Sequence, residues 1–248
     1  MLPIEERDAI NRLVREQVIP AIGCTEPICV ALAVSRATEE LGCRPQRIMA
    51  RLSANILKNA MGVGIPGTGM VGLPIAIALG AIVGKSAYGL EVLRDSTPDH
   101  VKEGQRYIDE QHISISLAEN APSKLYVDIT VFDADGREAR AVIAEQHTNF
   151  ILVSRGSEVL IDKTMDGGKE NTEKKEEVLQ LNMRKVFDYA TTSPLDELEF
   201  INEAKRLNEN AAARSLEGNY GHCLGKVLSR PLGRGIMGES IFSHILSS

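Results

Sequence analysis

The stretch from residue 113 to 161 constrains the fold most strongly, because it alternates apolar and polar or β-branched side chains in short runs. Five runs have this pattern: 113–117, 125–132, 139–145, 150–154 and 158–161. A period of two residues predicts strands with one buried face. Asp135-Gly136 favours a hairpin turn after the second run, and Arg155-Gly156-Ser157 marks another turn. We therefore expect an antiparallel sheet of about four or five strands.

Helical patterns flank this sheet on both sides in the sequence. Apolar residues at helical spacing predict a helix over 3–18 and a second helix from Thr25 to Leu41 that stops at Gly42. Residues 48–52 read as a strand, 71–83 as a buried helix, and 178–248 as further helices. The order of helix, sheet and helix predicts an α+β fold with the sheet inserted between two helical parts.

We expect a single domain over 1–248, with the site motifs in a helical part at 1–98 and the inserted sheet at 99–162. The charged segment 163–177 reads as a solvated linker before the C-terminal helices. Residues 238–248 are small and apolar and end without a cap or polar tail. From that pattern we expect a chain that is incomplete at its C-terminus and that forms homo-oligomers.

The composition excludes several classes of protein. The net charge is −6, aromatic residues make up 4%, and Trp is absent, which argues against a nucleic-acid partner. The longest apolar run, 71–83, is shorter than the roughly 20 residues that span a membrane. The first residues show no basic region followed by an apolar one. We expect a cytoplasmic protein with neither a nucleic-acid nor a membrane partner.

The four cysteines contain no Cys-x-x-Cys pair, so neither a closed zinc site nor a disulfide framework is expected. Cys24 precedes the second helix, where the helix dipole favours a thiolate that acts as a nucleophile or binds iron. The alternative is a small residue packed in a turn. Cys29 is expected in the core, Cys43 without a role, and Cys223 in packing.

Polar residues around the second helix and the first strand are candidates for a binding site. Thr25 and Glu26 have a structural interpretation as helix cap and first-turn acid, and a functional one as groups facing the pocket of Cys24. The candidates after the strand are Ser53, Asn55, Lys58 and Asn59. If the strand continues to Asn55, Ser53 and Asn55 share one face. Lys58 suits a carboxylate anchor or, if desolvated, a base, whereas the alternative is a solvated turn.

The glycine-rich loop supplies the third group of candidates: Gly67, Thr68 and Gly69. Residues 62–67 match a dinucleotide-binding pattern only formally, because Pro66 removes a backbone donor and repeated strand-helix-strand units are lacking. Met70 replaces the lysine of a Walker A loop. We expect a tight turn with donors open to an anion, or a turn without a ligand. His147 and His222 are predicted to be turn or surface residues.

In these motifs the chain resembles the L-cysteine desulfidase family, which is similar to the α chain of iron–sulfur L-serine dehydratases. The resemblance is carried by four segments: Gly23-Cys-Thr-Glu-Pro27, Ser53-Ala-Asn-Ile-Leu-Lys-Asn59, Ile65-Pro-Gly-Thr-Gly69 and Gly89-Leu-Glu-Val-Leu93. It continues more weakly through Gly218-Asn-Tyr-Gly221 and Gly225-Lys226. The motifs in this order cover most of the chain.

The resemblance implies β-elimination on a small amino acid, L-cysteine or L-serine, without pyridoxal phosphate. It also implies a [4Fe–4S] cluster held by three cysteines, of which Cys24 is one and the other two belong to a C-terminal segment that this chain lacks. We assign catalytic roles to Lys58 and Glu26. The substrate-binding set is Thr25, Ser53, Asn55, Asn59, Gly67, Thr68 and Gly69.

Two other functions remain open from the sequence: a non-catalytic amino-acid-binding or regulatory protein that lacks the cluster, and a thiol enzyme with Cys24 as nucleophile. All these functions require the segments around Cys24, Asn55 and Thr68 to meet in space.

Overall fold

The computed structural model describes residues 2–163, 181–219 and 223–228. The chain forms two compact units, one of residues 20–172 and one that joins residues 1–19 to 173–248. The larger unit contains the sheet and all three candidate site segments. The predicted linker at 163–177, apart from Lys163, and the apolar C-terminal segment at 238–248 lie outside the described residues.

The larger unit is built on one mixed sheet with strand order β4-β1-β5-β6-β7-β8. Its strands are β1 (Arg47–Leu52), β4 (Ile113–Leu117), β5 (Tyr126–Phe132), β6 (Glu138–Ala144), β7 (Phe150–Arg155) and β8 (Glu158–Asp162). The α+β class and the mostly antiparallel sheet are confirmed, and the five alternating runs are all strands. The sheet has one strand more than expected, because β1 joins it between β4 and β5 and pairs with β4 in parallel.

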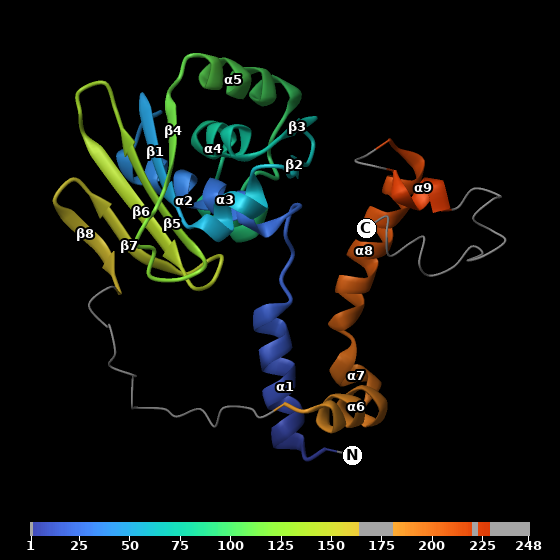
Figure 1. Ribbon diagram of the computed structural model, residues 1–248. Coiled ribbons are helices and arrows are strands. Elements are labelled where there is room, and N and C mark those ends of the chain that lie inside the picture. Colours follow the sequence, from blue (N-terminus) through green and yellow to red (C-terminus); the bar gives the residue numbers. More distant parts are fainter. Residues whose placement is uncertain (1, 164–180, 220–222, 229–248) are drawn as a thin grey trace. The chain divides into compact units, whose positions relative to one another are not determined.

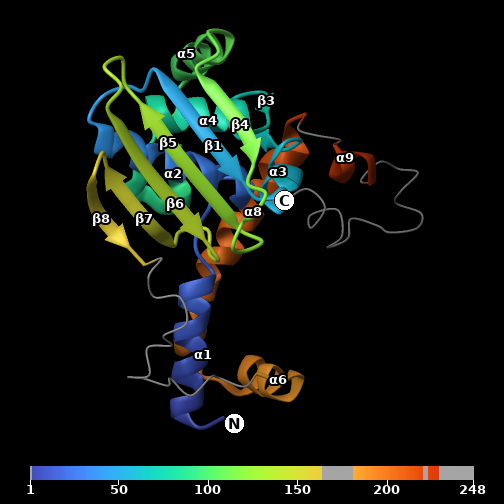
Figure 2. The same ribbon diagram turned by 60° about the vertical axis from the view of Figure 1, so that its left-hand side comes forward.

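The strand register explains which face of the sheet is buried. Ala50 lies opposite Ile129, Ile129 opposite Ala141, and Ala141 opposite Val153, so one buried row crosses four strands. Helices α2 (Thr25–Leu41) and α4 (Leu73–Ile82) cover this face (Figure 1). Turned by 60°, the same unit shows its strands in front of these helices (Figure 2).

The opposite face of the sheet is polar at its centre. Asp128 is 1% exposed, yet its carboxylate accepts hydrogen bonds from Arg140 Nε at 2.8 Å and Arg51 Nη2 at 2.5 Å. Register places Arg51 and Arg140 on the strands either side of Asp128. Two guanidinium groups therefore neutralise the buried carboxylate, as burial of a charge requires.

Helices α2 and α4 pack unusually closely. A Cβ on Gly80 of α4 would lie 2.7 Å from the carbonyl oxygen of Ala31 in α2, so only glycine fits there. Helix α2 ends as predicted at Gly42, whose φ of 75° is the left-handed conformation that glycine adopts readily. The glycine at this contact sets how closely α2 and α4 approach each other.

The connection from β1 to β4 contains the remaining elements of the unit. It comprises α3 (Ala54–Ala60), the hairpin β2 (Gly64–Ile65) and β3 (Met70–Val71), helix α4, the 3₁₀ helix η1 (Ser86–Glu91) and α5 (Pro98–Asp109). The continuation of the first strand to Asn55 is wrong, since β1 ends at Leu52 and Ser53 caps α3. Helix α5 was not predicted, although Thr97-Pro98 begins it with a capping box.

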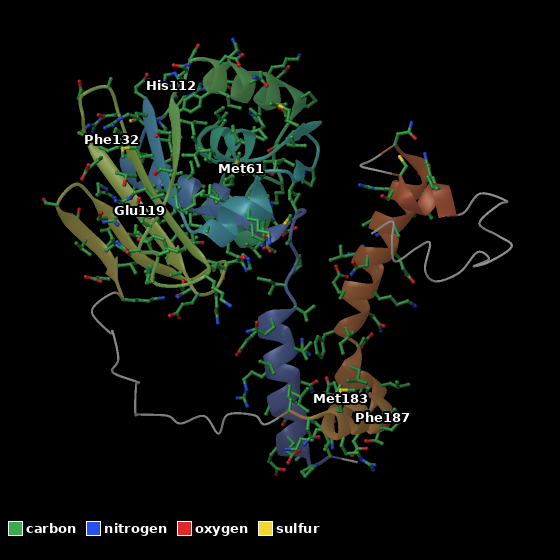
Figure 3. All side chains as sticks on the ribbon, in the orientation of Figure 1. Met61, His112, Glu119, Phe132, Met183 and Phe187 are labelled. Carbon is green, nitrogen blue, oxygen red and sulfur yellow. The ribbon has the colours of Figure 1, made fainter. Side chains whose placement is uncertain are left out.

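The regular elements of the smaller unit, within its described residues, are all helices. Helix α1 (Ile4–Gln17) contacts the segment of α6 (Met183–Thr192) and α7 (Leu195–Leu198): Arg7 forms a bidentate ion pair with Glu197, with both distances 2.8 Å. Helices α8 (Ile201–Glu217) and α9 (Leu224–Leu228) follow. Met183 and Phe187 on α6 are exposed (Figure 3). Within the described residues, each helix is too short or too polar to cross a bilayer.

Candidate functional site

The N-terminus of α2 presents a thiol, a hydroxyl and a carboxylate side by side. Cys24 is the N-cap residue, and Thr25 and Glu26 form the first turn, all three half-buried. The Cys24 thiol donates to Glu26 Oε2 at 2.9 Å, and the Thr25 hydroxyl lies 3.4 Å from the same oxygen. Both side chains therefore contact the Glu26 carboxylate, which lies in the first turn of α2, where the helix dipole favours a negative charge.

Helix α3 contributes the second group of candidates. Asn59 Nδ2 donates to Glu26 Oε1 at 3.3 Å, which joins α3 directly to the start of α2. Asn55, Lys58 and Asn59 are spaced i, i+3 and i+4, so they share one face of this short helix. Asn55 and Lys58 are exposed. A role of Lys58 as a base required a buried ammonium group, and Lys58 is exposed. An exposed ammonium group still suits the anchoring of a carboxylate.

Ser53 has a structural task in this arrangement. Its hydroxyl donates to the carbonyl of Lys124 at 2.7 Å and accepts from the Ile56 amide at 3.5 Å, and the residue is 3% exposed. The side chain thus caps α3 and ties it to the segment before β5. This geometry gives Ser53 the role of positioning α3 in place of the substrate contact proposed from the sequence.

The β2–β3 hairpin is the third segment, and it contacts the first one. A Cβ on Gly23 would lie 2.7 Å from Cγ of Pro66, so the tip of the hairpin packs directly against the residue before Cys24. Gly67 and Gly69 have φ values of 77° and 67°, which confirms a tight turn. The Thr68 hydroxyl donates to the carbonyl of Ile65 at 2.6 Å and accepts from the Met70 amide at 3.0 Å. Thr68 therefore holds the turn together.

Protonation at this site differs from the prediction for Cys24. Burial raises the pKa of the Cys24 thiol, and its hydrogen bond to Glu26 raises it further, while the backbone amides of Glu26 and Thr25 act in the opposite direction. The prediction of an unusually accessible thiolate is thus wrong, because a carboxylate lies next to the sulfur. The same hydrogen bond from Cys24 lowers the pKa of Glu26, so this side chain is a carboxylate at neutral pH.

This protonation state can be measured by alkylation with iodoacetamide at neutral pH. Cys43 is exposed and Cys29 is fully buried, where desolvation raises the pKa of the Cys29 thiol strongly. We expect Cys43 to be modified first, Cys24 more slowly, and Cys29 only on unfolding. Glu26→Gln removes the neighbouring charge and should accelerate modification of Cys24, by about tenfold for each pKa unit it lowers. Peptide mass spectrometry gives the three rates, and an unchanged Cys24 rate in Glu26→Gln would contradict this account.

The strand register shows which other segments reach the same end of the sheet. Leu52 pairs with Val127, and Tyr126 with Ala144, so the end of β1, the start of β5 and the end of β6 lie together. Arg155 at the other end of β7 donates to the carbonyl of Glu40, near the C-terminus of α2. The start of α2 therefore lies at the end of the sheet where the β6–β7 turn is found.

His147 lies in this β6–β7 turn, and the sequence analysis did not assign it to the site. It is half-buried, and charge on its side chain is the smallest of the effects that lower the pKa of Glu26, after the hydrogen bonds from Cys24, the Glu26 backbone and Asn59. A histidine in a predicted turn does not by itself indicate a place near Glu26. The pairing of β6 with β7 is what brings this turn to the start of α2. His222 lies outside the described residues.

The cysteines do not assemble into a cluster site within the residues that the structure describes. Cys29 is buried in the core, as predicted, and Cys43 follows the opposite end of α2. Cys223 belongs to the smaller unit. No group of three or more metal-binding side chains occurs in the described part of the chain. The described residues thus supply one suitable thiol, Cys24, and do not by themselves fit a [4Fe–4S] cluster.

The sequence is similar to UPF0597 proteins from several bacteria. It is 57% identical over 242 residues to one from Bacteroides fragilis, a match that covers 98% of this chain and 56% of that protein. With a UPF0597 protein from Phocaeicola vulgatus it shares 59% identity over 248 residues, covering 100% of this chain and 57% of the relative. With one from Porphyromonas gingivalis it shares 40% identity over 241 residues, a match that covers 96% of this chain and 55% of that protein.

No protein-family model matches the chain, and no solved structure matches it. The chain spans about half the length of the curated relatives that it matches.

Proposed function

We propose that this chain carries the amino-acid site of a cytoplasmic lyase that acts by β-elimination on L-cysteine or L-serine. The observation that carries the proposal is the contact of three polar segments: Asn59 of α3 donates to Glu26 of α2, and the hairpin packs on Gly23. Glu26 is ionised and suits the substrate ammonium group, and Lys58 suits the carboxylate. The products would be pyruvate, ammonia and either sulfide or water.

For the full-length protein we propose that Cys24 is one ligand of a [4Fe–4S] cluster whose other ligands come from residues outside this chain. Without a bound cation, the neighbouring Glu26 carboxylate disfavours the Cys24 thiolate. A bound cation would favour the thiolate. One thiol does not hold a cluster, so the contribution of this chain is to bind and orient the amino acid.

The test is an anaerobic assay of the full-length protein, supplied with iron and sulfide, for pyruvate released from L-cysteine and from L-serine. We expect pyruvate from at least one of them, with an equal amount of ammonia. Binding of these amino acids in calorimetry without any pyruvate would favour the second candidate, a non-catalytic binding or regulatory protein. The incomplete donor set of the described residues is the observation that favours this second candidate.

A thiol enzyme with Cys24 as nucleophile is the weakest of the three functions. Burial and the adjacent carboxylate both raise the pKa of Cys24, whereas a nucleophilic cysteine requires a lowered one.

A further inference from the structure

Strand β4 forms one edge of the sheet, and no strand of the described part of the chain lies on its outer side (Figure 2). On its inner side the Ala118 amide, just after β4, donates to the carbonyl of Leu52 in β1 at 2.8 Å. Alternate residues of a parallel strand bond to the same neighbour, so Ile113, Ile115 and Leu117 direct their N–H and C=O groups away from β1. Within the described residues these backbone groups have no hydrogen-bond partner.

The two edges of the sheet differ in how they are protected against pairing with another strand. At the other edge, β8 begins with Glu158, ends with Asp162 and has an irregular register with β7. Charges and bulges of this kind discourage a further strand. Strand β4 has the sequence Ile-Ser-Ile-Ser-Leu, without a charge or a proline, and its register with β1 is continuous. It is therefore the edge that can accept another strand.

We propose that β4 pairs in antiparallel orientation with β4 of a second copy of this chain, about a two-fold axis at Ile115. Ile115 then lies opposite Ile115 of the second copy, and Ile113 lies opposite Leu117. Each outward N–H meets an outward C=O, and the same surface serves both copies, as a closed dimer requires. The pairing covers Leu117, which is 51% exposed, and places Ser114 opposite Ser116, where the two hydroxyls can hydrogen-bond.

The charges at the two ends of β4 favour a second copy as the occupant. At the start of the strand, Arg106 lines a pocket and has no ion-pair partner among the described residues. Both glutamates that line this pocket already have cationic partners: Glu103 with Arg44, and Glu110 with His112. Just after the strand, Glu119 is exposed and likewise has no ion-pair partner in the described part of the chain. Antiparallel pairing brings the Glu119 end of each copy to the Arg106 end of the other, so the charges are complementary at both ends.

The experiment is a charge exchange at Ser114 and Ser116, both of which are exposed, in the full-length protein. Sedimentation velocity should give wild-type protein a mass twice that of one chain, with a Kd in the micromolar range because one strand per copy is a small interface. Ser114→Lys/Ser116→Lys and Ser114→Glu/Ser116→Glu each place like charges opposite one another, so each should raise the dimer Kd by at least about tenfold. An equal mixture of the two variants pairs opposite charges, and heterodimers should form at least as tightly as the wild-type dimer.

The matched control is Val159→Lys/Leu160→Lys, which adds the same charge at exposed positions of β8 and should leave the dimer Kd within about twofold of wild type. Circular dichroism of each variant shows whether it folds. As a second readout, hydrogen exchange at the amides of Ile113, Ile115 and Leu117 should be slower at high than at low protein concentration. A wild-type protein that stays monomeric up to its solubility limit, or a lysine variant of β4 that dimerises as tightly as wild type, would overturn the proposal. Slow exchange of these amides in the monomer would also overturn it, because another segment of the same chain would then cover the edge.

Discussion

Glu26→Gln should lower kcat/KM of the full-length protein for L-cysteine or L-serine by about 10²- to 10³-fold. The substitution retains the size of the side chain but removes the charge to which the proposed function assigns the attraction of the substrate ammonium group. The carboxylate accepts hydrogen bonds from Cys24 and Asn59, and its lowered pKa shows that the folded protein stabilises the ionised form. A neutral amide at this position loses that attraction.

The control for this prediction is Glu158→Gln, an exposed carboxylate at the β7–β8 turn. It changes the net charge by the same amount, so it should leave kcat/KM within about threefold of wild type. If Glu26→Gln also stays within that range while its Cys24 is alkylated faster, Glu26 stabilises only the local structure and has no part in the reaction. Rates of pyruvate release and of alkylation, measured on the same samples, separate the two roles.

Gly80→Val should destabilise the chain by about 3 kcal/mol, because overpacking of a close helix contact forces backbones apart. Even the first carbon of a side chain at this position would lie 2.7 Å from the carbonyl oxygen of Ala31 and 3.1 Å from its Cα. Backbone atoms of α2 cannot rotate away as a side chain would. The helix propensity that valine gains over glycine is smaller than the roughly 1 kcal/mol gained by alanine, so it does not offset this clash.

Gly104→Ala in α5 is the matched control for Gly80→Val. There the nearest atom to a new Cβ is Cδ1 of Ile75 at 3.0 Å, the flexible end of a side chain. We expect a stability change within about 1 kcal/mol of zero, because the gain in helix propensity and the repacking of Ile75 act in opposite directions. Urea unfolding followed by circular dichroism measures both variants. Equal midpoints for them would show that α2 moves away from α4 at little cost.

The strands of the main sheet and helices α1, α2 and α4 were predictable from the sequence because their signals are local. Alternation alone located β4 at 113–117, and Gly42 marked the end of α2. Turn chemistry at Asp135-Gly136 and at Gly156 also predicted the connections correctly, and both glycines have a positive φ. In each case the pattern of neighbouring residues determines the local structure.

The parts that sequence reasoning missed depend on contacts between distant segments. Residues 53–60 have polar side chains typical of a turn, yet they form a short helix because Ser53 caps it and buried Ile56 and Ala60 anchor it. The position of β1 inside the sheet depends on which strands it pairs with, and so does the position of the β6–β7 turn that contains His147. Strand pairing between distant segments cannot be read from a local sequence pattern. The raised pKa of Cys24 likewise depends on the rotamer of Glu26, which brings the carboxylate to the sulfur.

The parallel pairing of β1 with β4 has a consequence for how this protein can diversify. Parallel neighbours require a long crossover, and here the crossover at 53–112 carries both α3 and the glycine-rich hairpin. Insertions or deletions in that single connection can reshape what the protein accepts while every strand pairing is preserved. Under the proposed lyase function, changes in the length of α3 or of the hairpin would alter which amino acids fit, while the buried helix α4 in the same connection has to be retained.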